Sequence, residues 1–284
     1  MQQLTRAMKM VSAAKLKRSQ DRMLAARPYT ATMTRVFERL AARAVDYHNP
    51  LLDPRGDEHY VVALVTADRG LCGAFNTNLI KAAQQFIREN QGKKIELVPI
   101  GRKGRDFFRR RSFPILKDYI NVTAKTFDHE EAAVIAQAII EAFIAEGSEI
   151  DKVFLIYNEF KTVLSQRVII KQLLPVGAPS ESGANEYAAA TARDDSKVLV
   201  DYIYEQPPAE IFSTLLPRYI ETQVYQALLE SVASEHGARM TAMDAAQKNA
   251  GEVISSLTLN MNRVRQASIT REIIEVVSGA QALG

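Results

Sequence analysis

The sequence MDAAQKNAGEVISSLTLNMNRVRQA, residues 243–267, decides the fold because its apolar residues recur at intervals of three or four. They are Met243, Ala246, Ala250, Val253, Leu257, Met261, Val264 and Ala267. This spacing draws one stripe along a helix, close to the seam of a coiled coil. Residues 218–279 contain no proline and only three glycines, so at about 1.5 Å per residue they would form a rod of roughly 90 Å. The pattern favours one extended helix over a helix folded back into a bundle.

A second helical segment opens the chain. Residues 1 to about 47 repeat the three-four spacing, first at Leu4, Met8 and Val11 and again after Pro28. Its first turns are strongly basic, with Asp21 as the single acid among Arg6, Lys9, Lys15, Lys17, Arg18, Arg22 and Arg27. A solvated helix face, an acidic protein partner and a nucleic acid are all compatible with this charge. The lack of interleaved aromatic residues before Tyr29 weakens the nucleic-acid interpretation.

The middle of the chain alternates between strand and helix patterns. Short β-branched runs predict strands at 60–66, 94–100, 151–160, 163–174 and 198–205, and amphipathic runs predict helices at 76–90, 102–111 and 129–146. Alternation of this kind indicates an α/β unit with a largely parallel sheet. The expected fold class is therefore α/β: a Rossmann-like α/β body inserted between N- and C-terminal long helices that form an antiparallel coiled coil. The expected domains are residues 1–57, 58–206 and 207–284.

Composition narrows the class of protein. The 284 residues are 47% hydrophobic and 24% charged, with a net charge of +3, as in a soluble globular protein. The single cysteine, Cys72, excludes an intramolecular disulfide and suits a reducing compartment. The most apolar stretch, residues 132–145, is too short to span a bilayer. We expect a cytosolic protein unless a partner ties it to a membrane.

Residue patterns that carry chemistry are scarce. The Gly70–Gly73 turn is neither a dinucleotide fingerprint nor a phosphate loop, so tight packing between strand and helix explains it better than ligand binding. The four histidines have no metal-ligand spacing, and Cys72 has no histidine pattern that would make it a nucleophile. We therefore expect no catalytic residue, no cofactor and no metal site. The residues favour a mechanical or binding protein over an enzyme.

Three motifs resemble one known family. AMKMVSAAKL at residues 7–16 resembles the N-terminal signature of the gamma subunit of bacterial F-type ATP synthases. TADRGLCGAFN at 66–76 resembles the first strand-to-helix turn of that family. ASEHGARMTAMDAA at 233–246 and NRVRQASITREIIE at 262–275 resemble its C-terminal signature. The resemblance covers essentially the whole chain, in the same order and spacing.

The resemblance implies a rotor of the central stalk that performs no bond chemistry itself. In that family the terminal helices stand inside a ring of three alpha and three beta subunits, and the body holds the epsilon subunit and rests on the ring of c subunits. Proton flow turns the c ring and the axle, and the asymmetric axle biases each catalytic beta subunit in turn. The implied location is the cytoplasmic side of the cell inner membrane, as a peripheral protein, with no nucleic-acid partner.

The resemblance also implies site residues. Contacts with the alpha/beta ring would be made by Met8, Lys9, Glu235, Arg239, Gln266 and Thr270. The foot that meets the c ring and epsilon would include Tyr202, Tyr204 and Glu205. Glu235 and Arg239 lie one helical turn apart, so an ordinary surface ion pair is the alternative for these two.

Two other classes stay open at this point. One is an enzyme with a Rossmann-like body, which bound nucleotide would favour. The other is a coiled-coil nucleic-acid-binding or scaffold protein that uses the basic first helix, which steep salt dependence of duplex binding would support. The driving ion, the physiological direction of turnover and inhibition by epsilon are not readable from the residues.

The first residues match the family from inside its first helix, without a capping residue. If Met8 lies opposite Arg265, equal rise places Met1 opposite about Glu272, and residues 273–284 have no partner helix. We therefore expect the natural protein to start some four or five helical turns upstream of Met1, with a genuinely shortened axle as the alternative.

Overall fold

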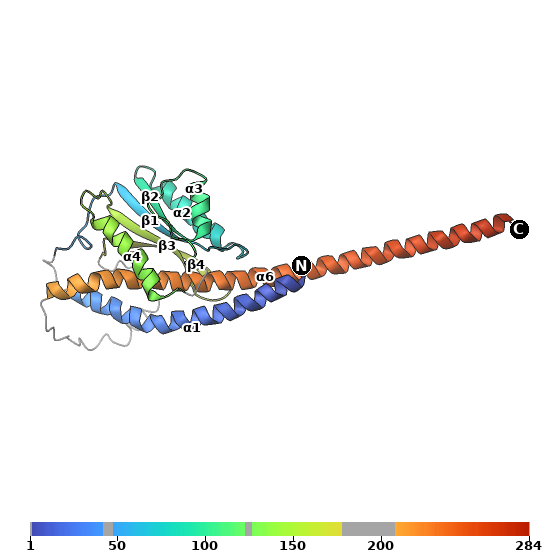
Figure 1. Cartoon of the computed structure of the whole chain (residues 1–284), viewed down its shortest axis with the longest axis horizontal. Coiled ribbons are helices and arrows are strands. Elements are labelled where there is room, and N and C mark those ends of the chain that lie inside the picture. The colour runs from blue at the N-terminus through green and yellow to red at the C-terminus, as the bar shows by residue number, and fades with distance from the viewer. Residues whose placement is uncertain (1, 42–47, 123–126, 178–207, 284) are drawn as a thin grey trace.

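The computed structural model describes residues 2–41, 48–122, 127–177 and 208–283, and consists of an α/β body from which one helix projects (Figure 1). The helices are α1 (Gln2–Ala41), α2 (Phe75–Glu89), α3 (Arg102–Arg109), α4 (His129–Ile144) and α6 (Pro208–Leu283). The strands are β1 (His59–Val65), β2 (Lys94–Ile100), β3 (Lys152–Phe160) and β4 (Gln166–Leu174). The element order confirms the α/β fold class with a long helix at each end.

The described strands form one sheet in the order β2-β1-β3-β4. β1 pairs in parallel with β2 and with β3, whereas β4 runs antiparallel to β3. The sheet is therefore mixed, with a parallel core and an antiparallel strand at its end. The strand expected at 163–174 begins only at Gln166, because Thr162 and Ser165 close the turn that precedes it. The strand expected at 198–205 lies outside the described residues.

Both faces of the sheet are covered, which explains why all seven residues of β1 are buried. Alternate residues point to opposite faces of a strand. Tyr60, Val62 and Leu64 join the core beneath α2 and α3, and Val61, Ala63 and Val65 join the core shared with α4 and the terminal helices. Figure 1 shows α2 and α3 on one side of the sheet and α4 with α6 on the other. This second layer fixes the terminal helices to the body.

The terminal helices run antiparallel and share the core of the body. Phe37 of α1 stacks on Tyr219 of α6, with ring centroids 4.5 Å apart, and meets Phe212 edge-on. Leu216, Val224 and Leu228 of α6 are fully buried in the same cluster as the sheet residues, and Leu16 and Met23 of α1 join it. The core is thus continuous across the expected boundaries at residues 57 and 206. Without α1 and α6, the part of this sheet face that they cover would be exposed to water, while α4 would still cover the rest.

Helix α6 is unbroken over 76 residues, which confirms the single extended helix and makes it about 114 Å long. Pro217 lies inside it without ending it. The expected pairing of Met8 with the region of Arg265 is wrong. Lys9 is paired with Asp244 at 2.5 Å, and a side chain at Gly251 would come within 3.3 Å of the Gln2 amide. The start of α1 therefore lies beside residues 244–251, and α6 continues alone beyond it (Figure 1).

Candidate partner-binding surfaces

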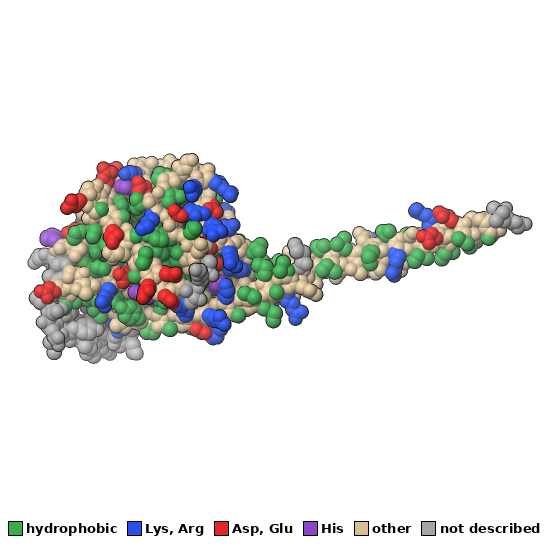
Figure 2. All heavy atoms as spheres, viewed as in Figure 1, with side chains coloured by type: hydrophobic (Ala, Val, Ile, Leu, Met, Phe, Trp, Pro, Cys, Tyr) green, Lys and Arg blue, Asp and Glu red, His purple; other side chains and the backbone are tan. Residues whose placement is uncertain are grey.

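The free half of α6, residues 252–280, is exposed along nearly its whole length. Its large apolar side chains are exposed as well, including Leu257 at 62%, Val264 at 67% and Val276 at 72%. Figure 2 shows hydrophobic side chains following this half of the helix to its end. Contiguous apolar surface of this extent marks a protein interaction site in a folded protein.

The apolar surface changes side along the free half. At 100° per residue, Val253, Leu257 and Val264 lie within about 40° of one another around the helix axis. Ile269, Ile273 and Val276 form a second face, roughly 150° away from the first. Farther along the helix, Arg271 and Glu275 lie on the same side as the first face. The stripe expected from the sequence is therefore only the first of two faces. The recurrence of Ile and Val at 269, 273, 276 and 277 is the signal that could have revealed the second.

The predicted contact residues are divided between several places. Gln266 and Thr270 are exposed on the free half of α6. Met8 and Lys9 are half-buried on α1, where the two helices part. Tyr202, Tyr204 and Glu205 lie outside the described residues.

The point where the helices part is held by an ion cluster. Asp244 accepts a hydrogen bond from Lys9 and lies 3.2 Å from the ammonium of Lys248, one turn along α6. These two cations lower the pKa of the Asp244 carboxyl, that of Lys9 first. Nearby on α1, Leu4, Met10 and Val11 are exposed apolar side chains. Lys9 is thus already engaged within the chain, whereas its neighbours offer free apolar surface.

Glu235 and Arg239 are buried, at 4% and 9% exposure, so the alternative of a surface ion pair is wrong. Their carboxylate and guanidinium are 2.7 Å apart. The guanidinium also donates to the carbonyl oxygen of Gly70 at 3.3 Å and approaches Nδ1 of His236 at the same distance. The pair therefore fastens α6 to the turn that follows β1.

Burial shifts the protonation equilibria of this cluster. Burial raises the pKa of Glu235, and the Arg239 cation opposes that shift. Burial lowers the pKa of His236 to about 4, and the charges of Arg239 and Lys15 add to the shift. At neutral pH His236 is therefore uncharged.

The turn that meets Arg239 comes within van der Waals contact of α6. Gly73 has a left-handed backbone with φ of 56°, and a side chain there would lie 3.6 Å from the Cβ atom of Ala242. Cys72 is buried beside it, as expected of a packed cysteine, and Asn76 donates to its sulfur at 3.1 Å. The glycines permit close packing against α6 as well as the turn itself. No residue pattern in the sequence indicates this contact between the motifs at 66–76 and 233–246.

Within 2–41, 48–122, 127–177 and 208–283, no group of three or more His, Cys, Asp or Glu residues is placed to hold a metal ion. In the same ranges, no helix has an apolar stretch of sufficient length to cross a bilayer.

Comparisons with known proteins point to one family. The family model described as ATP synthase matches residues 1–283. The ATP synthase gamma chain of Solibacter usitatus is 50% identical over 99% of this chain and 93% of its own length. That of Geobacter metallireducens is 47% identical over the same shares. Among solved structures, a chain of the central stalk and c-ring of the Tetrahymena thermophila mitochondrial ATP synthase superposes with a TM-score of 0.61 at 26% identity, covering 86% of this chain and 99% of that one.

Proposed function

Because the chain belongs to the ATP synthase gamma chain family, we propose that the free half of α6 stands inside a ring of alternating alpha and beta subunits and turns there. The chain is a non-catalytic subunit of the synthase and forms its central-stalk rotor, which couples proton flow to ATP synthesis. It is a peripheral part of that complex. The family assignment replaces the enzyme, nucleic-acid-binding and scaffold alternatives.

The exposed apolar surface of residues 252–280 is the observation that carries the proposal. A helix that is apolar on two opposite sides needs partners on more than one side to bury both faces. A ring satisfies this requirement, whereas a single antiparallel helix would cover one face only.

The change of side also supports rotation as the mechanism. The first and second apolar faces point in different directions, so a surrounding subunit meets a different face at each angle of the axle. A partner shifts a conformational equilibrium only by binding its states differently. An axle with a different face toward each catalytic beta subunit meets that condition.

Each predicted ring contact has a distinct role in this proposal. Gln266 and Thr270 contact the ring directly, because both are exposed on the free half. Met8 contributes at the base of the axle, where Lys9 also holds α6 through Asp244. Glu235 and Arg239 act by fixing the turn after β1 to α6, and direct ring contact by either would require their burial to be relieved.

The body takes the other partners. We place the epsilon subunit and the c ring at the body, with Tyr202, Tyr204 and Glu205 in the foot that meets the c ring. Because these residues immediately precede α6, which begins at Pro208, we expect them at the end of the body that is remote from the free half. The proposed location is the cytoplasmic side of the inner membrane.

The test compares three substitutions on the free half of α6 with one matched substitution on the body. Val264→Ser lies on the free half of α6, and Val134→Ser lies on the exposed face of α4. We expect Val264→Ser, Gln266→Ala and Thr270→Ala to lower ATP-driven proton pumping by the assembled complex severalfold, with the melting temperature of the isolated chain unchanged. Val134→Ser should leave pumping at the parental rate. Parental pumping by all three variants of the free half would contradict the proposal.

A further inference from the structure

The turn after β1, residues 66–73, touches α6 close to the point where the helix leaves the body. A side chain at Gly73 would lie 3.6 Å from the Cβ atom of Ala242. Among the described residues of α6, Met243 is the last that is buried. The turn therefore gives α6 lateral support at the base of the axle.

One buried carboxylate fastens the other side of this turn to the body. Asp68 is 6% exposed, and its Oδ1 atom accepts hydrogen bonds from the backbone N–H groups of Arg102 at 3.0 Å and of Asn121 at 2.9 Å. Arg102 is the first residue of α3, where backbone N–H groups have no partner within the helix. The carboxylate therefore joins three segments, namely the turn, the start of α3 and the segment that follows α3.

The next residues of α3 are held by the same turn. The hydroxyl oxygen of Thr66 accepts from the N–H of Gly104 at 2.9 Å, and the carbonyl oxygen of Ala67 accepts from the N–H of Lys103 at 3.1 Å. A side chain at Gly101 would lie only 2.0 Å from the carbonyl oxygen of Thr66. The turn and the start of α3 thus meet backbone to backbone.

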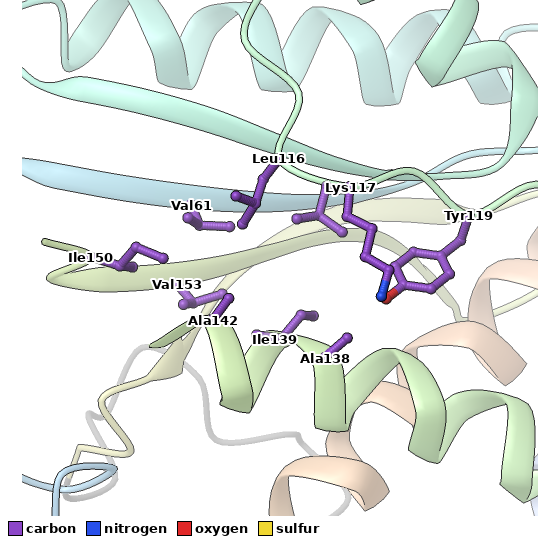
Figure 3. A pocket seen from close by; sticks show the side chains of 10 residues that line it. Val61, Leu116, Lys117, Tyr119, Ala138, Ile139, Ala142, Ile150 and Val153 are labelled. Atoms are coloured by element: carbon purple, nitrogen blue, oxygen red, sulfur yellow. The ribbon is translucent and has the colours of Figure 1, made fainter. Parts of the chain in front are cut away.

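The segment that follows α3 is itself fixed to the sheet. The N–H of Tyr119 donates to the carbonyl oxygen of Pro99 at 3.0 Å, and its carbonyl oxygen accepts from the N–H of Gly101 at 2.7 Å. Figure 3 shows this segment beside the sheet, where Tyr119 and its neighbours line a pocket whose other wall is α4. Asp68 therefore binds the turn to parts of the body that do not depend on α6.

We propose that Asp68 is a positioning residue of the rotor, which acts through Arg239 and makes the turn after β1 a rigid support for α6. This inference rests on the proposed rotor function. Arg239 binds the turn from the side of α6, through the carbonyl oxygen of Gly70, and Asp68 binds it from the side of the body. Without the carboxylate, the N–H groups of Arg102 and Asn121 lose their acceptor. The turn then yields when α6 carries a load, so the ring can move α6 without the body following.

The ratio of proton pumping to ATP hydrolysis in the assembled complex tests this role. Asp68→Ala should lower the ratio severalfold, because ATP is then hydrolysed without full movement of the body. Asp68→Asn keeps an oxygen acceptor in the same place and should keep the parental ratio. Asp118→Ala is the matched control, since Asp118 also follows α3 but forms an exposed ion pair with Arg105, and it should be parental. A variant that only destabilises the chain lowers pumping and hydrolysis together, and its ratio stays unchanged.

Formate can replace the missing carboxylate and gives a second, independent measurement. Asp68→Ala should lower the melting temperature of the isolated chain by several degrees. Formate should raise the melting temperature of this variant and restore its ratio of pumping to hydrolysis, whereas chloride at the same concentration should do neither. The parent, whose own carboxylate fills the position, should not respond to formate. If Asp68→Ala assembles only in formate, removal of formate after assembly gives the same comparison.

Two results would overturn the proposal. One is a parental ratio of pumping to hydrolysis in Asp68→Ala, and the other is an equal response of parent and variant to formate. Failure of the rotor function itself would appear separately, as parental pumping by Val264→Ser, Gln266→Ala and Thr270→Ala. The response of the isolated chain to formate does not depend on that function.

Discussion

The two halves of α6 belong to one continuous helix but have opposite surroundings. Residues 212–243 pack against the sheet, α4 and α1, and several of their apolar side chains are completely buried. Residues 252–280 have equally apolar side chains and touch almost nothing within the chain. Apolar content therefore does not separate the half that stabilises the fold from the half that we propose to contact partner subunits.

The difference shows what each half is for. A buried apolar side chain contributes to the free energy of folding of the chain, at about 1.5–3 kcal/mol for a fully buried Leu or Val. An exposed apolar side chain contributes nothing until a partner covers it. The same substitution in the two halves should therefore change different measurements, and that expectation can be tested position by position.

Leucine truncation should give the largest contrast. Leu228→Ala, in the buried half, should lower the free energy of unfolding of the isolated chain by about 4 kcal/mol, through lost burial and the cavity left behind. Leu257→Ala, in the free half, should change it by less than about 0.5 kcal/mol. Urea unfolding followed by circular dichroism measures both. Equal destabilisation by the two variants would mean that the free half folds back onto the chain in solution.

Arginine truncation should give the next largest effect. Arg239→Ala leaves the Glu235 carboxylate buried without its cation and should destabilise the chain by about 3 kcal/mol. Arg265→Ala, on the exposed free half, serves as the matched control and should be neutral. Thermal unfolding of the isolated chain decides. If Arg239→Ala were as stable as the parent while pumping failed, Arg239 would act on the ring rather than on the fold.

Local structure was predictable from the sequence, whereas the pairing of distant segments was not. The extended helix, the strand at 94–100 and the helices of the body were predictable because apolar periodicity reports local structure directly. The pairing of the terminal helices was not, because a heptad pattern looks the same after a shift by whole heptads. The error from Arg265 to Asp244 amounts to about three heptads.

The candidate site was predictable only in part, for a related reason. Exposure of Gln266 and Thr270 follows from their place on the long helix. Burial of Glu235 and Arg239 does not, since a charged pair one turn apart looks the same on a surface and in a core. Their burial depends on Gly70 and Gly73, which are distant in sequence and meet α6 only after folding.

Lowering the pH should destabilise the folded chain through His236, which lies in the buried half of α6. Its pKa is lowered to about 4 in the folded chain, against an ordinary value of 6.5. The uncharged form thus stabilises the fold fully above about pH 6.5, and this contribution is lost as the pH falls toward 4. The free energy of unfolding of the parent, minus that of His236→Gln, should decrease by about 2 kcal/mol between pH 7.5 and pH 5. Urea unfolding at several pH values measures it, and a difference that does not vary with pH would show that His236 is exposed.

Glu230 should give the smallest effect and the opposite sign. It lies in the buried half of α6, where burial raises the pKa of its carboxyl and Glu159 adds to the shift. One carboxylate oxygen accepts from Gln226, and the other is buried without a hydrogen bond to the described residues. A raised pKa means that the folded chain binds more protons, so its stability declines as the pH rises above about 4.5. Replacing this charge by a neutral amide should therefore stabilise the chain at neutral pH.

The expected gain for Glu230→Gln is about 1 kcal/mol at pH 7, vanishing below about pH 4.5, where the parent carboxyl is protonated as well. Glu275→Gln makes the same change on the exposed free half and should leave the stability within about 0.5 kcal/mol of the parent at both pH values. Urea unfolding of the three proteins at pH 4 and pH 7 measures both predictions. A loss of stability in Glu230→Gln at pH 7 would mean that the charged form is favourably paired. In that case the charged Glu230 carboxylate would stabilise the fold. A gain of stability would instead show that the charged carboxylate lowers the free energy of unfolding.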